Sequence, residues 1–438
     1  MGNSSGTPSP PPRVVIVGAG FGGIEVARRL CRCRVPMQIV LIDKTNHHLF
    51  QPLLYQVATA ALSPADIAAP IRSIFHRCPT VSIVLDEVTA VNPQRREVLC
   101  RHSGAIGYDF LVLAPGSCPN YFGHDHWRQF APPLKTLKDA LELRRRILEA
   151  YELAASCPDP EEARAYTTFV VIGGGPTGVE LAGALAEIGR FTMTRDFPQL
   201  NPEDIRVVLL EAGPRLLPSF PPKLSARALR DLTELGVNVC LGVRATDIQP
   251  TGVLLSTGEF LAARTVIWAA GTQAPDFLRS LGVPLDRSGR VIVAEDCSVP
   301  GFPEIFVIGD ASCFRDPRFG ELPALAPVAL QQGRFVARLL CARRPPARRP
   351  HFRYRHRGIL ATIGRARAVA ALPPNLHFGG FLAWLLWAAV HIVTLIRFRN
   401  RFAVLSEWLW YYLTYQPGAR LLIEPSSTPP GHSPTAPS

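Results

Sequence analysis

Two stretches of this chain share a pattern of buried strand, glycine-rich turn and helix, and this pattern constrains the fold more than any other feature. The first stretch, from residue 13, is RVVIVGAGFGGIEVARRL, and the second, from residue 168, is TFVVIGGGPTGVELAGALAEI. In each case a further apolar strand follows and ends in an acid, Asp43 in the first stretch and Glu211 in the second. Strands that alternate with helices in this order predict the α/β class with parallel sheets.

The glycines of both turns occupy the positions that binding of a dinucleotide requires. A pyrophosphate is bound by backbone N–H groups at a helix N-terminus, and glycine lets the main chain turn tightly and approach the phosphates. One G-x-G-x-x-G is weak evidence, but here each one follows a strand, opens a helix and precedes an acid that can bind a ribose hydroxyl. The second spacing is long, so its extra residues must loop out. The predicted residues are Gly18, Gly20, Gly23 and Asp43, and Gly173, Gly175, Gly178 and Glu211.

A chain with two dinucleotide sites is typical of enzymes that pass a hydride from a nicotinamide to a flavin. We assign FAD to the N-terminal site because a later strand, FPEIFVIGDAS at residues 302–312, ends in Asp310. A carboxylate there can bind the ribityl chain of FAD, and the next helix, which begins near Ala326, can direct its positive end at the flavin ring. The alternative is that Asp310 is an ordinary helix N-cap.

The net charge of +12 is concentrated toward the C-terminus. Fourteen arginines and no Asp, Glu or Lys lie between Arg334 and Arg401, so the rest of the chain is slightly acidic. The same stretch contains FGGFLAWLLWAAVHIVTLI at 378–396, nineteen residues without formal charge. Arginines beside an apolar run suit an anionic membrane surface better than the phosphates of nucleic acid. We therefore expect a membrane partner and no nucleic-acid partner.

The apolar run is long enough to cross a bilayer core, which takes about 20 residues. However, Arg397, Arg399 and Arg401 follow at once, and a crossing from the cytoplasm would place them on the far side, against the positive-inside rule. We expect this helix to lie in the interface, with the stretch from Arg334 to Arg367 facing anionic headgroups. The aromatic residues expected at headgroup depth are Trp384, Trp387, Trp408, Trp410, Tyr411 and Tyr412.

The ten cysteines include no C-x-x-C, so a thioredoxin-type pair and a zinc site of that spacing are excluded, and no metal site is expected. No cysteine lies between Thr45 and Phe75, which argues against a disulfide reductase with a C-x-x-x-x-C pair. We expect scattered reduced thiols in a cytosolic protein. The segment before Val14 lacks the apolar core of a secretory signal.

Several longer segments resemble one family, the bacterial type II NADH dehydrogenases. The segments are VVIVGAGFGG, LIDKTNHHLFQPLLYQVATA, VVIGGGPTGVELAG, VIWAAGT, VFVIGDAS, VALQQGRFVA and ATIGRARAVA, within about residues 13–423. The resemblance implies two Rossmann-like domains, the second inserted in the first, with non-covalent FAD, NADH as substrate and membrane quinone as acceptor, without proton pumping. It also implies a C-terminal membrane-binding region and a peripheral location on the cytoplasmic side of the inner membrane. Whether the protein is a homodimer is left open.

The residues and the resemblance together predict a division of the chain into domains and disordered ends. In chain order these are a disordered N-terminus at 1–12, an FAD-binding domain at 13–125 and 298–341, a helical connector at 126–165, an NADH-binding domain at 166–297, a membrane-binding region at 342–424 and a disordered tail at 425–438.

Carried over residue by residue, the resemblance implies contacts to each dinucleotide. For FAD the implied residues are Gly18, Gly20, Gly23, Asp43, Lys44, Ala114, Gly116, Asp310 and Gln331, and for NADH they are Gly173, Gly175, Gly178, Glu180, Glu211 and Gly271. For catalysis we expect Gln331 and Gln332 at the quinone and Glu180 as an ionisable group near the nicotinamide. The alternatives are helix-surface amides for the glutamines and an ion pair for Glu180. Pro327 departs from the family pattern, which commonly has a glutamine there that is thought to line the quinone site.

Two other functions fit parts of the sequence. A sulfide:quinone oxidoreductase would use separated cysteines facing the flavin, and Cys157, Cys313 and Cys341 are available. A flavin-carrying binding protein with vestigial redox activity would look much the same. The complete second glycine-rich turn, with its acid, favours a working NADH site over both.

Overall fold

The computed structural model describes residues 10–396, 398–414 and 418–422, and these form two compact units. Unit 1 comprises the described residues within 1–48, 69–118 and 272–355, and unit 2 those within 49–68, 119–271 and 356–438. The domain boundaries above stay a prediction. In the packing, however, the residues after 355 belong with the second glycine-rich turn.

Unit 1 is built on a six-stranded sheet whose centre is the first apolar strand. In spatial order the strands are β20 (Ser298–Val299), β21 (Phe302–Val307), β9 (Phe110–Leu113), β1 (Arg13–Val17), β2 (Gln38–Asp43) and β5 (Val81–Leu85). β1 pairs in parallel with both β2 and β9, which confirms the predicted parallel sheet. Val14, Val15 and Ile16 are fully buried, as continuous apolar strands of a parallel sheet require.

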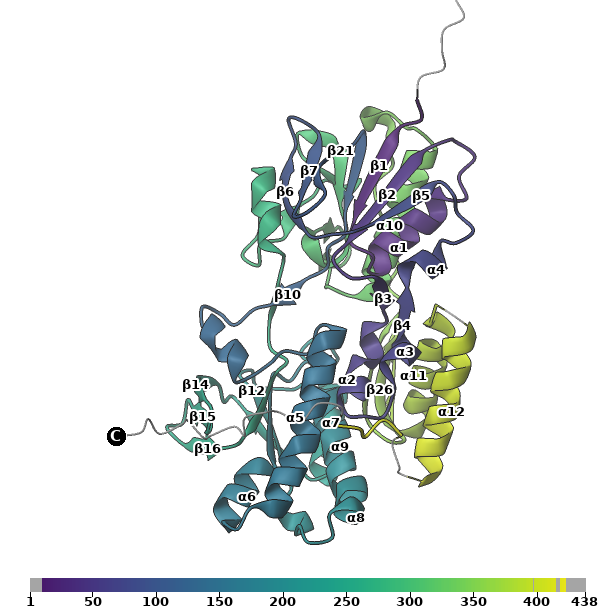
Figure 1. Ribbon diagram of the computed structural model, residues 1–438. Helices are drawn as coiled ribbons and strands as arrows, with labels where there is room; N and C mark the ends of the chain where they lie inside the picture. The colour runs from purple at the N-terminus through teal and green to yellow at the C-terminus, as the bar shows by residue number, and fades with distance from the viewer. Residues whose placement is uncertain (1–9, 397, 415–417, 423–438) are drawn as a thin grey trace, which may run out of the picture. The chain divides into compact units, whose positions relative to one another are not determined.

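Two long helices of unit 1, α1 (Phe21–Leu30) and α10 (Ala326–Cys341), pack against each other (Figure 1). A side chain at Gly333 of α10 would lie 2.8 Å from the carbonyl oxygen of Gly22 in α1, so the close approach requires glycine there. α10 begins at Ala326, as predicted, and Pro327 fits its first turn because the first N–H groups have no partner within the helix. The smaller elements of unit 1 are α4 (Ile71–Ile74), β6 (Val88–Asn92), β7 (Glu97–Cys100), β8 (Gly104–Gly107), β19 (Val291–Ile292), β22 (Ser312–Cys313), β23 (Arg315–Asp316) and β24 (Gly320–Glu321).

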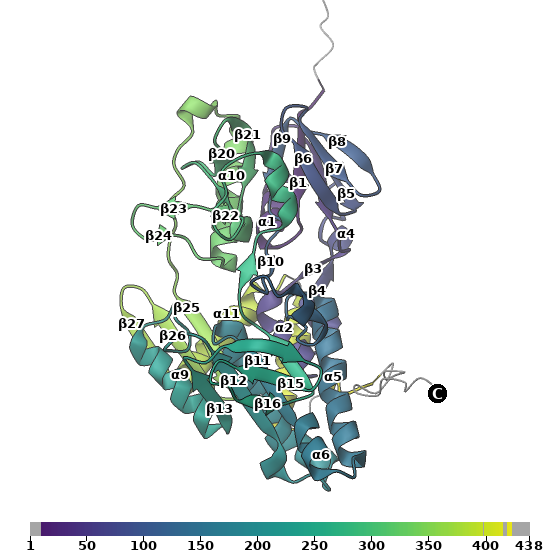
Figure 2. The same ribbon diagram turned by 90° about the vertical axis from the view of Figure 1, so that its left-hand side faces the viewer.

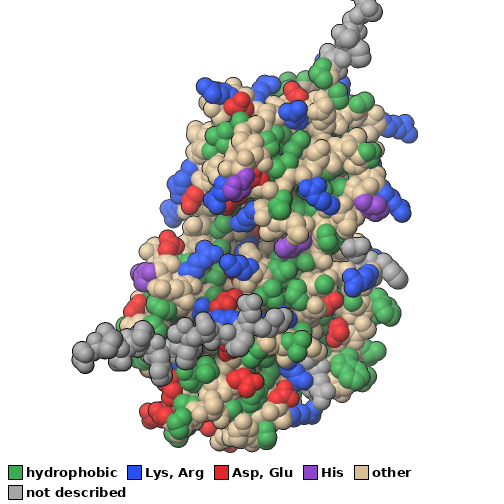
Figure 3. Space-filling view, in the orientation of Figure 1, with side chains coloured by type: hydrophobic (Ala, Val, Ile, Leu, Met, Phe, Trp, Pro, Cys, Tyr) green, Lys and Arg blue, Asp and Glu red, His purple; other side chains and the backbone are tan. Residues whose placement is uncertain are grey.

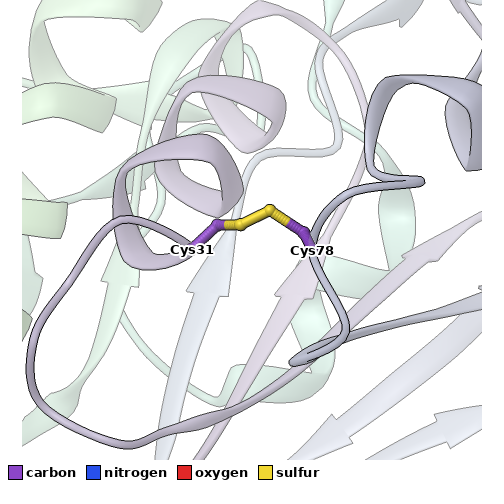
Figure 4. The surroundings of a disulfide bond; sticks show 2 residues. All are labelled: Cys31 and Cys78. Atoms are coloured by element: carbon purple, nitrogen blue, oxygen red, sulfur yellow. A yellow bond between two sulfur atoms is a disulfide. The ribbon is translucent and has the colours of Figure 1, made fainter.

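A disulfide joins Cys31, at the end of α1, to Cys78, with Cα atoms 6.0 Å apart (Figure 4). The expectation that all the cysteines are reduced was therefore wrong for this pair. The two residues are 47 positions apart, and no local spacing rule could pair them.

Unit 2 repeats the same architecture with four parallel strands (Figure 2). In spatial order they are β13 (Val237–Leu241), β12 (Arg206–Glu211), β11 (Thr168–Ile172) and β17 (Thr265–Trp268), and the larger helices are α5 (Leu137–Ser156), α6 (Pro160–Tyr166), α7 (Pro176–Glu187) and α9 (Pro222–Glu234). A three-stranded antiparallel sheet consists of β14 (Ala245–Gln249), β15 (Gly252–Leu255) and β16 (Phe260–Ala262). After α7 the chain forms a π-helix, Ile188–Met193, and α8 (Thr194–Asp196) before it enters β12, so the extra residues loop out as expected.

The C-terminal part of unit 2 is an antiparallel sheet followed by two helices. They are β25 (Ile359–Gly364), β26 (Arg367–Leu372), β27 (Leu376–Gly379), α11 (Phe381–Thr394) and α12 (Phe398–Thr414), the helices in yellow in Figure 1. A side chain at Gly183 of α7 would lie 1.6 Å from the carbonyl oxygen of Ile363, so glycine permits β25 to pack directly on α7.

The two short helices at the start of unit 2, α2 (Leu54–Ala58) and α3 (Pro64–Ile67), hold the C-terminal helices in place. The buried Asn400 of α12 donates hydrogen bonds from Nδ2 to the carbonyl oxygens of Ala65 and Asp66, at 3.1 and 2.8 Å. Carbonyls at a helix end need such outside donors. Among the described residues, no helix combines the length and the apolar character needed to cross a membrane.

Candidate active site

The first glycine-rich turn contains glycines of two kinds. A side chain at Gly18, where φ is +98°, would lie 2.2 Å from the carbonyl oxygen of Ala114, and one at Gly23 would lie 1.8 Å from that of Gly18. Packing therefore requires both glycines. Gly20 differs, because its φ is −73° and nothing lies within 4 Å of a Cβ built there. That open space at the N-terminus of α1 is what an approaching pyrophosphate requires.

The second turn repeats this division in unit 2. A side chain at Gly173 would lie 2.7 Å from the carbonyl oxygen of Ala269, and one at Gly178 would lie 1.8 Å from that of Gly173. Gly175 has a φ of −73° and an open Cβ position. Each turn therefore contains one glycine that the fold does not require. Binding of a phosphate group would require that glycine.

The two predicted acids lie against the turns in the same way. Asp43 Oδ2 accepts a hydrogen bond of 2.6 Å from the N–H of Ala19, and Glu211 Oε2 accepts one of 2.6 Å from the N–H of Gly174. Glu211 thus reaches its turn despite the long insertion before β12. Each carboxylate oxygen has further lone pairs, which can accept bonds from ribose hydroxyls.

The remaining residues expected at FAD lie along the carboxyl edge of the unit 1 sheet. Ala114 and Gly116 follow β9, and Asp310 follows β21, the strand paired with β9. Asp310 Oδ2 accepts a hydrogen bond of 2.8 Å from Ser117 Oγ. Asp310 is not the N-cap of α10, which is Leu325. Lys44 is exposed beyond the end of β2. Ligands of open α/β sheets bind at this edge, so the placement fits FAD.

A buried histidine next to the first turn offers a further test of whether this site fits a bound FAD. His48 is 2% exposed, and its Nδ1 lies 2.8 Å from the carbonyl oxygen of Ala19. Burial lowers the pKa of His48, so the ring is neutral, with Nδ1 as donor and Nε2 as acceptor. Nε2 has no hydrogen-bond partner within the part of the chain that the structure describes. A buried acceptor left open beside Ala19 is consistent with a bound cofactor.

The two glutamines expected at the quinone have other partners. Gln332 is 0% exposed, and its Oε1 accepts a bond of 2.7 Å from the N–H of Gly309. Gln332 thus binds the turn that precedes Asp310, and its predicted contact with the quinone stays a prediction. Gln331 forms hydrogen bonds of 2.9 and 3.0 Å with the backbone carbonyl and N–H of Arg355.

Near Gly271, the structure adds one residue that the sequence patterns did not indicate. Phe122 has a positive φ of 52° and is 64% exposed. Its ring lies over Gly271, where an added Cβ would be 2.5 Å from Phe122 Cζ. An exposed aromatic ring in a strained backbone is typical of a ligand site. The one sequence signal for Phe122 is the Tyr-Phe-Gly run at residues 121–123.

A pocket lies within unit 2, with an empty volume of about 720 Å³ that is partly open to solvent. Its walls come from α2 and the chain just after it, α7, the turn between β25 and β26, and the helices α11 and α12. The lining residues are Tyr55, Gln56, Thr59, Ala61, Glu180, Ala184, Glu187, Ile188, Thr362, Gly364, Arg365, Trp384, Trp387, Trp408, Tyr411 and Tyr412. Of the residues predicted for catalysis, Glu180 alone lies in this wall.

Two carboxyl groups of α7 face the pocket. The N–H of Thr362 donates a 3.4 Å hydrogen bond to Glu180 Oε1, and that of Arg365 donates a 2.5 Å bond to Glu187 Oε1. Burial raises the pKa of Glu180 to about 8 and that of Glu187 to about 7. Both groups can therefore gain or lose a proton near neutral pH.

A chain of neutral polar groups forms another part of the wall. Trp408 Nε1 donates to Gln56 Oε1 at 2.7 Å, and Gln56 Nε2 donates to the Tyr55 hydroxyl at 2.8 Å. Burial raises the pKa of Tyr55 well above its ordinary value, so its hydroxyl stays protonated. The Trp387 and Trp408 rings stack at 5.2 Å.

Most aromatic residues expected at headgroup depth therefore belong to the pocket. Trp410 is 55% exposed, but the other five line the wall. These five side chains line the pocket, and their predicted depth at the headgroups stays a prediction.

The outward faces of α11 and α12 carry a set of exposed apolar side chains, which we call the apolar face. They are Phe381, Leu382, Leu385, Val390, Val393, Phe402, Leu405, Leu409, Trp410 and Leu413, each between 39% and 70% exposed. In Figure 3 hydrophobic side chains gather over α12. The basic stretch is partly neutralised, since Arg334 pairs with Glu25, Arg349 with Asp296 and Arg367 with Glu234. These three arginines pair with acids of their own units, and the expectation that the stretch faces headgroups stays a prediction.

Comparison with known proteins places the chain in a family. The pyridine nucleotide-disulphide oxidoreductase family matches residues 12–333, and the NDH2 C-terminal domain family matches 356–414. The type II NADH:quinone oxidoreductases Ndh and NdhA of Mycobacterium tuberculosis are each 40% identical to this chain, over 93% and 90% of its length and 89% and 86% of their own. The structure of NDH2 from Plasmodium falciparum in complex with NADH shares the fold, with a TM-score of 0.84 at 20% identity, covering 92% of this chain and 99% of that one. The chain belongs to the type II NADH:quinone oxidoreductases.

Proposed function

We propose that this chain oxidises NADH bound at the second glycine-rich turn and reduces a quinone bound in the pocket of unit 2, with FAD held at the first turn. As a type II NADH:quinone oxidoreductase it has FAD as cofactor, NADH as donor and quinone as acceptor. When bound, FAD supplies a two-electron carrier between nicotinamide and quinone. One combination of observations carries the proposal. The glycine-rich turns have open space at Gly20 and Gly175, where a pyrophosphate can approach, and the pocket is lined by two titratable carboxyl groups.

The composition of the pocket wall suits a quinone. Its tryptophans and tyrosines offer flat apolar surfaces to the quinone ring, whereas the two ring carbonyls need hydrogen-bond donors. Glu180, with a pKa of about 8, is protonated at pH 7 and can donate to a carbonyl oxygen. As negative charge develops on that oxygen, the same group can transfer its proton. The proposed role of Glu180 is therefore at the quinone, and the earlier expectation of a role near the nicotinamide remains the alternative.

Residues around the second turn support the NADH site. The open position at Gly175 leaves space for the pyrophosphate, and Glu211 can accept bonds from ribose hydroxyls. We assign Phe122 and Gly271 to the nicotinamide end, because an exposed ring over a glycine leaves a flat surface for a ligand ring.

We further propose that the apolar face binds the membrane from its cytoplasmic side. The same two helices line the pocket with their inner faces and expose leucine and phenylalanine on their outer faces. A long-tailed quinone could then leave the lipid beside α11 and α12 and reach the pocket over a short path. Helices with one apolar face commonly lie in the interface in this way.

The surroundings of the three cysteines do not support the alternative function, that of a sulfide:quinone oxidoreductase. Cys313 is buried, the Cys341 thiol is hydrogen-bonded to Cys33, and Cys157 Sγ donates to the carbonyl oxygen of Asp159 at 3.5 Å. None of the three lines the pocket.

Anaerobic double mixing tests the proposal. We expect the purified protein to be yellow, to lose its visible absorbance on mixing with NADH, and to regain it on mixing with a quinone, with one quinol formed per NADH consumed. Sulfide, in the same experiment, should leave the absorbance unchanged. A colourless protein that takes up no added FAD would contradict the proposal, as would bleaching by NADH that no quinone reverses.

A further inference from the structure

The proposed reaction requires one proton from water in each turnover. The balanced reaction is NADH + H⁺ + quinone → NAD⁺ + quinol. The hydride from NADH supplies two electrons and one proton, whereas quinol contains two protons more than quinone. The second proton must therefore reach the quinone inside the pocket, whose wall contains six aromatic side chains.

Glu187 occupies a position from which it can supply that proton. It is 6% exposed, it lines the pocket, and it is the last residue of α7 before the π-helix. Irregular helical turns of this kind are frequent at functional sites. Glu180 lies seven residues earlier on the same helix face, roughly 10 Å away along the axis. Ala184 lies between them in the wall of the pocket, whose empty volume is about 720 Å³.

We propose that Glu187 takes up a proton from water and passes it through pocket water to Glu180, which delivers it to the quinone. In this step an O–H bond of Glu187 breaks, a proton moves along the water to the carboxylate of Glu180, and Glu187 is then reprotonated from solvent. No electron moves and no further reactant is needed. The inference rests on the proposed quinone site and adds to it the entry point of the proton.

The groups around Glu187 allow both of its protonation states. Burial favours the neutral acid, whereas the N–H bond from Arg365 and the charges of Arg365 and Arg367 favour the carboxylate. The balance is a pKa of about 7 for Glu187. Tyr55, on α2, also interacts with Glu187, but its own raised pKa keeps it neutral. The Arg365 guanidinium lies 4.0 Å from the centre of the Tyr412 ring, so its charge is held on that side of the pocket.

A purely structural role for Glu187 is the competing explanation. Its bond to the N–H of Arg365 ties the turn between β25 and β26 to α7, and its loss would loosen the C-terminal sheet. Glu187→Gln separates the two roles, because glutamine keeps the acceptor oxygen and cannot ionise. Glu234→Gln is the matched control, since Glu234 is an exposed acid that pairs with Arg367 outside the pocket.

The experiment follows the two half-reactions of the full-length holoenzyme by stopped flow between pH 5.5 and 9. For the wild type we expect the rate of quinone reduction to fall as the pH rises through about 7, because the fraction of enzyme with a protonated Glu187 decreases. Glu187→Gln should slow quinone reduction about 10²-fold at pH 7, the lower range for a positioned acid, and should remove this inflection. Reduction by NADH should not change in the variant, and Glu234→Gln should behave as wild type.

Two results would overturn the proposed role of Glu187. A Glu187→Gln enzyme with the wild-type pH profile and rate of quinone reduction would overturn the inference. If that variant does not fold, Glu187→Asp, which keeps an ionisable group, must retain an inflection at a shifted pH, and a profile without one overturns it equally. Failure of the proposed function would be evident separately, because wild-type enzyme reduced by NADH would then not react with quinone.

Discussion

Replacing Gly175 with valine should abolish NADH oxidation while the protein keeps its fold and its bound FAD. A valine is compatible with the backbone, since φ is −73° and no atom lies within 4 Å of the added Cβ. The branched side chain would instead fill the space that the pyrophosphate must enter. We expect the rate of flavin reduction at low NADH concentration to fall by more than about 10²-fold. This corresponds to a loss of about 3 kcal/mol in the free energy of NADH binding.

The reciprocal change, Gly20→Val, should give a folded protein that purifies colourless. Gly107→Val serves as a control, because Gly107 lies in β8 with only one atom near the added Cβ, at 3.9 Å. The measurements are the visible absorbance per chain, circular dichroism and stopped-flow reduction. Normal NADH affinity in Gly175→Val would show that NADH binds elsewhere.

Placing charge on the apolar face should release the protein from membranes. In a Leu382→Glu, Leu409→Glu and Leu413→Glu triple variant, three side chains that are 61% to 70% exposed would no longer enter the lipid interface. Burying one leucine contributes about 1.5–3 kcal/mol, so the loss of three should reduce partitioning to anionic vesicles by at least about 10³-fold. Reduction of a long-tailed quinone in vesicles should fall with it, whereas reduction of a soluble short-tailed quinone should persist because the pocket is unaltered.

Vesicle flotation measures this partitioning directly. Leu85→Glu is the control, because Leu85 is similarly exposed, at 57%, but lies on β5 and is not part of the apolar face. If the triple variant floats with vesicles as well as wild type does, the membrane is bound through another surface.

The strand, turn and acid of each dinucleotide site could be predicted because the motif is local in sequence. Gly18 and Gly23 are fixed by contacts within a few residues or with the neighbouring strand, and Asp43 binds the turn itself. Glu211 was harder to assign, since the insertion before β12 stretches the spacing. Its 2.6 Å bond to Gly174 depends on β12 pairing beside β11.

The pocket could not be predicted because five separate stretches of the chain build it. Tyr55, Glu187, Arg365 and Trp408 have no common spacing, and α7 carries both an apolar core side and the two acids. The surroundings of Gln332 could not be predicted either. Its position in a helix suggested a surface amide or a ligand contact, whereas its environment is the buried turn at Gly309. Burial of one polar side chain is a tertiary property that helix periodicity alone does not reveal.

Filling the pocket tests the central claim most directly. Ala184→Phe adds a ring to the wall between Glu180 and Glu187 without changing either acid. We predict that NADH will bleach the visible absorbance of this variant at the wild-type rate, and that a saturating quinone will restore it at least about 10²-fold more slowly, since an occupied pocket excludes the quinone ring. Restoration at the wild-type rate, in a variant shown to be folded and to contain FAD, would contradict the assignment of this pocket as the quinone site.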